Sequence, residues 1–297
     1  MNNAVEQDAS SDLNSAQIAE DSSLIGGYAY QIIRKQAKQV FKLRSPVIAD
    51  TNPENLHQMR IGTRRLRSAL LLFADTVEIK GTAPIELSKS VAKLTKSLGK
   101  VRDIDVMEQW LVQMLDAPEG SISIQEEGEN ASAIASTDSP FSKKEKKVIQ
   151  SLLKALRKRR KKQFAQMEST LGSSPYKKLV KQCKRWIKQP KFSPVAQQTA
   201  ASSAIRKMVE PLAELLQHPS WEIATKAAAK STAKNSSSEA KSQRRIIKRI
   251  SLDQLNQQLD QHGDQLHDLR KQIKSIRYQT EFFRGLYGIH YAAQIRE

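Results

Sequence analysis

Two stretches of the chain repeat the same arrangement of charged and apolar residues. The first is LHQMRIGTRRLRSALLLF at Leu56–Phe73, and the second is LHDLRKQIKSIRYQTEFF at Leu266–Phe283. The offset between them stays at 210 residues, from position 57 to position 267, without a gap. A repeat of this kind constrains the fold strongly, because each copy is expected to form the same structural unit. The matched pairs are His57 with His267, Arg60 with Arg270, Arg64 with Lys274, and Arg67 with Arg277.

Helical periodicity gathers the matched basic residues on one side of each segment. In an α-helix, which turns about 100° per residue, each set of four falls within a stripe about 80° wide. An apolar stripe lies directly beside each set, as expected for a helix face that packs on a core. We call the two sets the first column (His57, Arg60, Arg64 and Arg67) and the second column (His267, Arg270, Lys274 and Arg277). The neighbouring apolar stripes hold Met59, Thr63, Leu66, Leu70 and Phe73 in the first copy and Leu269, Ile273, Ile276 and Phe283 in the second.

The columns predict a negatively charged ligand. Like charges one helical turn apart repel by a few tenths of a kcal/mol per pair, so a column at the edge of a core is costly without a compensating anion. The alternative is a solvated face whose long side chains snorkel to water. Two copies in identical phase favour the ligand.

Net charge supports the same expectation. The chain carries a formal charge of +18, yet residues 1–23 and 115–142 contain acids and no Lys or Arg. The positive charge is therefore concentrated on the remaining segments. A body this basic favours a polyanionic partner, which leaves nucleic acid, polyphosphate or an anionic membrane surface.

Periodicity and capping signals predict an all-α fold. A first helix is expected from Ser22 or Ser23 to about Leu43. A second helix should begin with Asn52 as N-cap and Pro53 at the first helical position, and extend through the first motif to about Asp75. A third helix should begin at Pro84 and end at Gly99, and a fourth should begin at Asp103 or Asp105. The later helices are expected at Ser142 to about Leu171, opened by a capping box, Tyr176–Trp186, about Pro194–Leu216, Arg244–Leu259 and the second motif.

These elements define a domain organisation. Residues 1–21 are predicted to be a disordered acidic tail, and residues 116–142 an acidic flexible linker. Residues 22–115 should form a first helical bundle and residues 143–290 a second, with a Lys/Ala/Ser loop at 226–243.

The repeated motifs also resemble a known family. LHxxRxxxxRLR followed by LGxxRDxDV at Leu98–Val106 is similar to the first half of a CHAD domain (conserved histidine α-helical domain), and LHxLRxxxKxxRYxxEFF is similar to its second half. The resemblance extends from about Leu24 to Tyr287. It implies two four-helix bundles related by pseudo-twofold symmetry, with both motif helices lining a basic central cavity. It further implies binding of inorganic polyphosphate and association with polyphosphate granules.

The two columns are therefore the primary candidate site. Arginine suits phosphate because its planar fork donates two parallel hydrogen bonds, whereas lysine acts as a point charge. For the histidines, a hydrogen bond to phosphate and a structural role are equally good interpretations. Asp103 could complement a helix N-terminus or orient an arginine of the first motif. Secondary basic candidates are Lys100, Arg102, Arg34, Lys38, Arg157 and Lys161, the last two within RKRRKK at Arg157–Lys162.

We expect a binding protein and not an enzyme. The sequence has no Gly-rich phosphate loop, no CxxC, no GxSxG and no acidic ExExK strand, so no catalytic residue, cofactor or metal site is predicted. Phosphate release from polyphosphate would overturn this expectation. Cys183 is the only cysteine and is interpreted as a core residue. The lack of a signal peptide or a 20-residue apolar run predicts a cytoplasmic, non-membrane protein.

The main alternative is a non-specific nucleic-acid-binding protein, since such binding needs only Lys and Arg to neutralise phosphates. Single-strand binders, however, interleave aromatic residues for base stacking. Neither column contains one except Tyr278 at the edge of the second, so polyphosphate is the favoured ligand.

Overall fold

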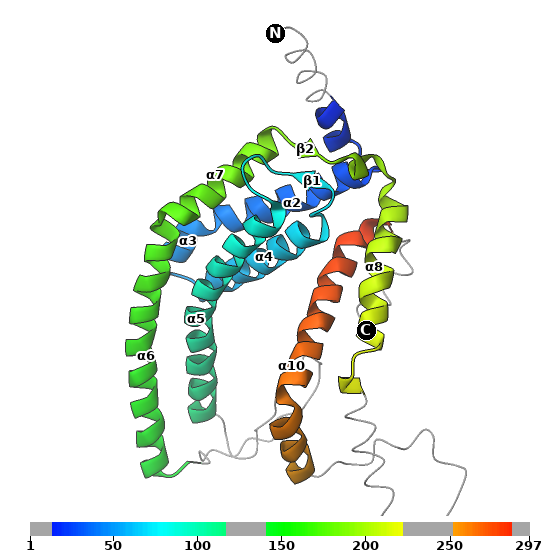
Figure 1. Cartoon of the computed structure of the whole chain (residues 1–297). Helices are drawn as coiled ribbons and strands as arrows, with labels where there is room; N and C mark the ends of the chain where they lie inside the picture. Colours follow the sequence, from blue (N-terminus) through cyan, green and yellow to red (C-terminus); the bar gives the residue numbers. More distant parts are fainter. Residues whose placement is uncertain (1–13, 117–140, 222–251, 287–297) are drawn as a thin grey trace, which may run out of the picture. The chain divides into compact units, whose positions relative to one another are not determined.

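The computed structural model describes residues 14–116, 141–221 and 252–286, and the side chains of residues 252–259 are not described. The described chain is almost entirely helical (Figure 1), which confirms the all-α prediction. A helix over residues 14–20 precedes the labelled elements. The α-helices are α2 (Ile25–Lys42), α3 (Arg44–Ala49), α4 (Pro53–Leu72), α5 (Pro84–Asp116), α6 (Lys143–Gly172), α7 (Ser174–Lys188), α8 (Ala200–Leu216) and α10 (Leu252–Phe283). The short elements are β1 (Val77–Glu78), which pairs with β2 (Lys191–Phe192), and the 3₁₀ turns η1 (Pro194–Gln197) and η2 (Arg284–Leu286).

The helices are grouped into two compact units. Unit 1 comprises Met1–Ile32, Asp75–Val77 and Phe192–Glu297, and unit 2 comprises Ile33–Ala74 and Glu78–Lys191. In unit 2, α4 packs on α5, and α5 packs on α6 and α7. The sequence assigned α6 and α7 to a second bundle, so the units do not follow the predicted boundaries. The two symmetric four-helix bundles and their shared cavity stay a prediction.

Unit 2 is built on the first motif helix. Asn52 caps α4 by accepting a hydrogen bond from the Glu54 amide at 2.8 Å, with Pro53 in the first turn, which confirms the predicted helix start. The apolar stripe of α4, including Met59, Leu66 and Leu70, is fully buried. Burial of each such side chain stabilises the fold by roughly 1.5–3 kcal/mol. The column beside it is therefore held in a fixed register.

The predicted break between a third and a fourth helix is wrong. α5 runs without interruption from Pro84 to Asp116, and Gly99 is a buried residue inside it. A Cβ at Gly99 would lie 3.4 Å from the Arg60 guanidinium of α4. Gly99 thus provides room for a close approach between two helices, and it does not end one.

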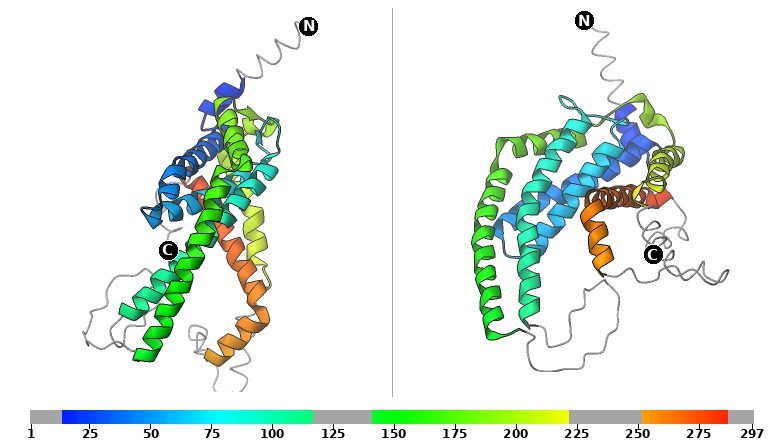
Figure 2. Two further views of the ribbon diagram at one scale, coloured as in Figure 1. Left: turned by 90° about the vertical axis from the view of Figure 1, so that its left-hand side faces the viewer. Right: turned by 60° about the horizontal axis from the view of Figure 1, so that its bottom comes forward.

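A three-residue ion cluster joins α6 to the rest of unit 2. Arg160 of α6 donates hydrogen bonds to both carboxylate oxygens of Asp50, at 2.6 and 2.7 Å, and to Asp105 of α5 at 2.6 Å. The hydrogen bonds that Arg160 donates to Asp50, and to a smaller extent the one it donates to Asp105, raise the pKa of Arg160 above its ordinary value, and burial opposes this shift. Figures 1 and 2 show α5 and α6 side by side along their length. The predicted capping box of Ser142 and Glu145 opens α6 as expected.

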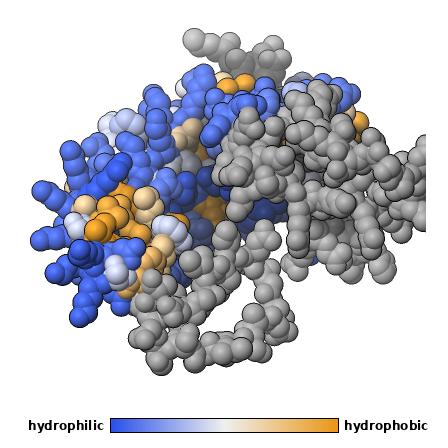
Figure 3. All heavy atoms as spheres, turned by 90° about the horizontal axis from the view of Figure 1, so that it is seen from below, coloured by the Kyte–Doolittle hydropathy of each residue, from blue (hydrophilic) through white to orange (hydrophobic). Residues whose placement is uncertain are grey.

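Apolar residues are exposed where α5 ends and α6 begins. Viewed from below, the molecule shows a hydrophobic area bordered by hydrophilic residues (Figure 3). The exposed large apolar side chains of these two helices include Met107 and Trp110 of α5 and Val148 and Leu152 of α6.

Part of the segment predicted to be a disordered tail is helical in unit 1. Residues 14–20 form a helix whose Ile18 is buried, whereas residues 1–13 lie outside the described residues. A Cβ at Gly26 would clash with the Ile18 side chain, so this glycine permits the helix to pack on α2. The acidic composition of this segment predicted disorder, but one apolar face of the helix, which includes Ile18, is enough to pack it on α2.

In the rest of unit 1, α10 contacts both α8 and α2. These two helices pack together, and Tyr28 of α2 donates a hydrogen bond to the Phe282 carbonyl at 2.7 Å while its ring stacks on Phe283. Residues 117–140 of the predicted linker, the 226–243 loop and residues 244–251 lie outside the described residues. Within the described ranges, no helix is long and apolar enough to cross a membrane.

Cys183 should be inert in the folded protein. Cys183 lies on α7 with its thiol buried, and burial raises the pKa of the thiol to about 12. Almost no reactive thiolate therefore forms at pH 8. We expect a disulfide reagent such as DTNB to label native protein far more slowly than denatured protein. Rapid labelling under native conditions would show that this part of unit 2 opens readily.

Candidate functional site

The first column lies along one edge of α4, beside the buried stripe, as predicted. His57, Arg60 and Arg64 are half-buried, and Arg67 is exposed. No ion pair is formed by Arg64 or Arg67 within the described part of the chain. The column therefore presents two uncompensated guanidinium groups from a helix that is firmly packed on the other side.

Arg60 differs from the rest of its column. Its Nη1 lies 3.0 Å from Asp103 Oδ1 of α5, above the backbone of Gly99. This pair confirms that Asp103 orients an arginine of the motif helix. The competing interpretation, a carboxylate at a helix N-terminus, is wrong because α5 is continuous there. Nε of Arg60 is buried with no hydrogen-bond partner among the described residues.

Two of the secondary candidates lie on the same turns of α5. Lys100 is exposed and Arg102 is half-buried, and both are adjacent in sequence to the Gly99 and Asp103 contacts of Arg60. Neither forms an ion pair with any described residue. The structure thus places these two cations on the helix that the first column packs against.

The second column lies on α10 in unit 1. His267, Arg270 and Arg277 are exposed, and Lys274 is half-buried. Arg277 approaches the Glu281 carboxylate at 3.5 Å and lies over the neighbouring Tyr278 ring. Arg270 has no ion-pair partner in the described ranges. Arg270 is thus available to an anion, and the predicted core-facing residue Ile273 is 40% exposed.

The remaining secondary candidates lie on α2 and α6. Arg34 and Lys38 are exposed on α2, and Lys161 is exposed on α6. Arg157 of α6 is paired with Glu108 of α5 at 2.7 Å, so its charge is already compensated.

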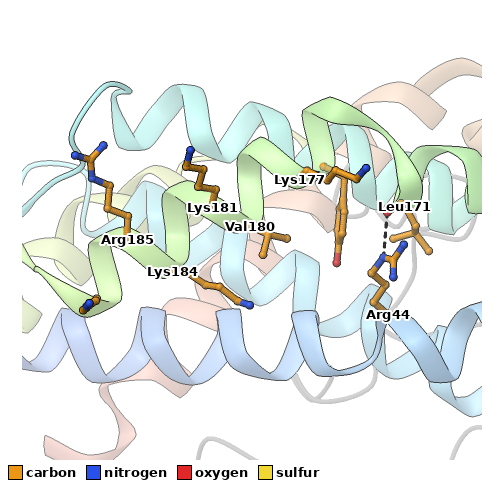
Figure 4. A pocket seen from close by; sticks show the side chains of 9 residues that line it. Arg44, Leu171, Lys177, Val180, Lys181, Lys184 and Arg185 are labelled. Carbon is orange, nitrogen blue, oxygen red and sulfur yellow. Dashed lines mark hydrogen bonds between the residues drawn. The ribbon is translucent and has the colours of Figure 1, made fainter.

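A row of lysines on α7 was missed by the sequence reasoning. α7 was predicted from its apolar residues alone, yet Lys177, Lys181, Lys184 and Lys188 recur at spacings of four, three and four. They line a groove of about 890 Å³ together with Arg44 of α3 and Arg185. Figure 4 shows Arg44 on one side of this groove and the labelled basic side chains of α7 along the other. The spacing was the available signal, since it is the same periodicity that revealed the two columns.

The chemistry of these sites is recognition of anions. No three His, Cys, Asp or Glu side chains cluster as metal ligands within the described residues. Arg and Lys donate hydrogen bonds and positive charge, which phosphate oxygens accept.

Comparison with known proteins agrees with the helical fold. The family model described as CHAD domain matches residues 31–297. Among solved structures, the chain is similar to the crystal structure of the CHAD domain from the plant Ricinus communis, with 20% identity and a TM-score of 0.54. That match covers 93% of this chain and 72% of the plant chain. No curated protein matches the sequence.

Proposed function

The chain belongs to the CHAD domain family, and from this premise we propose that it binds inorganic polyphosphate through the two columns. The contacts are assigned to His57, Arg60, Arg64, Arg67, His267, Arg270, Lys274 and Arg277. Lys100 and Arg102 extend the first column on α5. The protein binds polyphosphate without hydrolysing it, and needs no cofactor.

One observation carries this proposal. Arg64, Arg67 and Arg270 occupy repeated positions on two helices, and none has a carboxylate partner among the described residues. Arg60 is paired with Asp103 and Arg277 approaches Glu281, so the uncompensated charge is that of the other arginines, of which Arg64 and Arg67 lie about one helical turn apart and repel each other. A ligand with a repeating negative charge compensates these unpaired arginines together, whereas a single phosphate compensates only part of them.

Arg60 has a supporting role in this arrangement. Its pairing with Asp103 fixes the guanidinium against α5, which reduces the entropy that the side chain would lose on binding. The same contact positions the α4 backbone relative to Lys100 and Arg102. Arg60 therefore contributes partly through the orientation of its neighbours.

The granule association implied by the family is a proposal that follows from this binding. A protein that holds long polyphosphate through two columns would be retained where that polymer accumulates.

Salt dependence tests the proposal. We expect labelled long-chain polyphosphate to bind, with log K falling linearly against log[salt] at a slope of roughly −4 or steeper, because each neutralised phosphate releases condensed counterions. Fluorescence anisotropy between 50 and 300 mM salt measures this slope. Absence of binding at low salt, or an affinity independent of salt, would contradict the assignment.

A further inference from the structure

Unit 2 holds a basic groove that lies outside both columns. It runs between α7 and the segment formed by α2 and α3 (Figure 4). A second depression of about 410 Å³ shares Lys184 and Lys188 with it and adds Lys38 and Lys42 of α2. The shared residues place the two hollows next to each other along α7.

Most of the residues that line this groove are basic. Six basic side chains border the larger hollow and no carboxylate does, and none of the six forms an ion pair with a described residue. Arg185 and Lys188 suit the negative end of the helix dipole, but Lys177 lies in the first turn, where a cation is unfavourable. Helix stability therefore does not account for the row.

A buried hydroxyl points to a ligand independently of the charge. Tyr176 is 6% exposed and lines the groove, and its hydroxyl oxygen is buried with no hydrogen-bond partner among the described residues. Burial raises the pKa of this phenol, although nearby Arg44 opposes the shift, so the group remains a donor. An unpaired buried hydroxyl is destabilising, and an accepting oxygen in the groove would offset this cost.

Arg44 is held in position beside this hydroxyl. Its Nε donates a hydrogen bond to the Leu171 carbonyl at 3.1 Å, the bond drawn in Figure 4. Because that carbonyl is near the C-terminal end of α6, the bond anchors the guanidinium and leaves its other N–H groups to the groove. The groove thus has a fixed fork and a neutral donor at one end, and a row of ammonium groups along its length.

We propose that this groove is a second binding segment for a linear chain of phosphates, with Arg44 and Tyr176 donating to one phosphoryl group and the α7 lysines compensating those that follow. The inference rests on the proposed function for its ligand class, but it uses different residues. From Lys177 to Lys188 the helix rises about 16 Å, which suits several linked phosphates better than one. A nucleic acid fits less well, since Tyr176 is buried and offers no ring face for stacking.

Paired charge reversals test the groove. We expect Lys181→Glu with Lys184→Glu to weaken binding of long-chain polyphosphate at least tenfold relative to Lys93→Glu with Lys147→Glu. The control pair changes the net charge equally at exposed positions of α5 and α6. Orthophosphate should compete poorly with the polymer. If the groove pair binds as the control pair does, the groove assignment is overturned while the proposed function stands, and if wild-type protein does not bind polyphosphate, both fail.

Tyr176→Phe tests the hydroxyl without changing charge. Removal of a buried unpaired donor should leave the melting temperature unchanged or raise it, whereas the loss of a bond to phosphate should weaken binding roughly fivefold or more. Unchanged affinity would overturn the role of Tyr176. Equal binding of single-stranded DNA at matched phosphate concentration, with the same sensitivity to the Lys181 and Lys184 changes, would overturn the ligand assignment.

Discussion

Reversing the charge of Arg67 and Arg270 together should weaken polyphosphate binding at least 100-fold. Each arginine is exposed and has no ion-pair partner among the described residues, so neither substitution removes an internal contact. A charge-assisted hydrogen bond contributes about 1.5–3 kcal/mol, and two glutamates add repulsion to the loss. Fluorescence anisotropy with labelled polyphosphate at fixed salt measures the change.

The choice of Arg67 over Arg60 follows from the structure. A glutamate at position 60 would face Asp103 across α4 and α5, so loss of binding could then reflect a damaged fold. The pair Lys93→Glu with Lys147→Glu removes the same total charge and should change affinity by less than about threefold. Near-normal binding by the Arg67 and Arg270 variant, with an unchanged helical circular dichroism spectrum, would show that the columns are not the site.

Arg160→Met should destabilise the protein by about 3 kcal/mol. The Asp105 side chain is 9% exposed and pairs with Arg160, and Asp50 loses the same partner. Removal of one partner of a buried ion pair leaves an uncompensated charge and typically costs 3–5 kcal/mol; partial exposure of Asp50 places this case at the lower end. The melting temperature should fall by roughly 6–10 °C.

The adjacent residue provides the control for this prediction. Arg159 is exposed, and none of the ion pairs within the described residues involves it, so Arg159→Met should shift the melting temperature by no more than about 1–2 °C. Equal shifts for the two variants would mean that the cluster of Arg160, Asp50 and Asp105 adds little to the stability of unit 2.

The first motif helix could be predicted almost completely because its signals are local. The cap at Asn52, the proline that follows it and the apolar phase all act within a few turns, and the structure reproduces each of them. The position of the first column followed directly, since a basic residue beside a buried stripe has only one place on the helix.

Gly99 shows where local reasoning fails. A glycine after an apolar run resembles a helix C-cap, but here it lies inside α5 and accommodates the Arg60 side chain. That contact joins two helices, so no signal near Gly99 in the sequence distinguishes the two uses. The sequence offered an Asp103–arginine contact as one of two equally good interpretations, and the structure shows this contact.

The α7 groove depends even more on distant residues. The lysine spacing was visible in the sequence, but the hollow exists only because Arg44 and α2 lie opposite α7. The buried state of the Tyr176 hydroxyl also follows from packing. A charged row can be predicted from one helix, whereas the cavity that makes it a site requires the neighbouring elements.

Competition between polyphosphate and nucleic acid tests the central claim most directly. Wild-type protein bound to labelled long-chain polyphosphate at near-physiological salt would be titrated with single- or double-stranded DNA at matched phosphate concentration. We predict that polyphosphate displaces bound DNA while DNA leaves polyphosphate bound. Displacement of polyphosphate by an equal amount of DNA would contradict the account and identify a general polyanion binder.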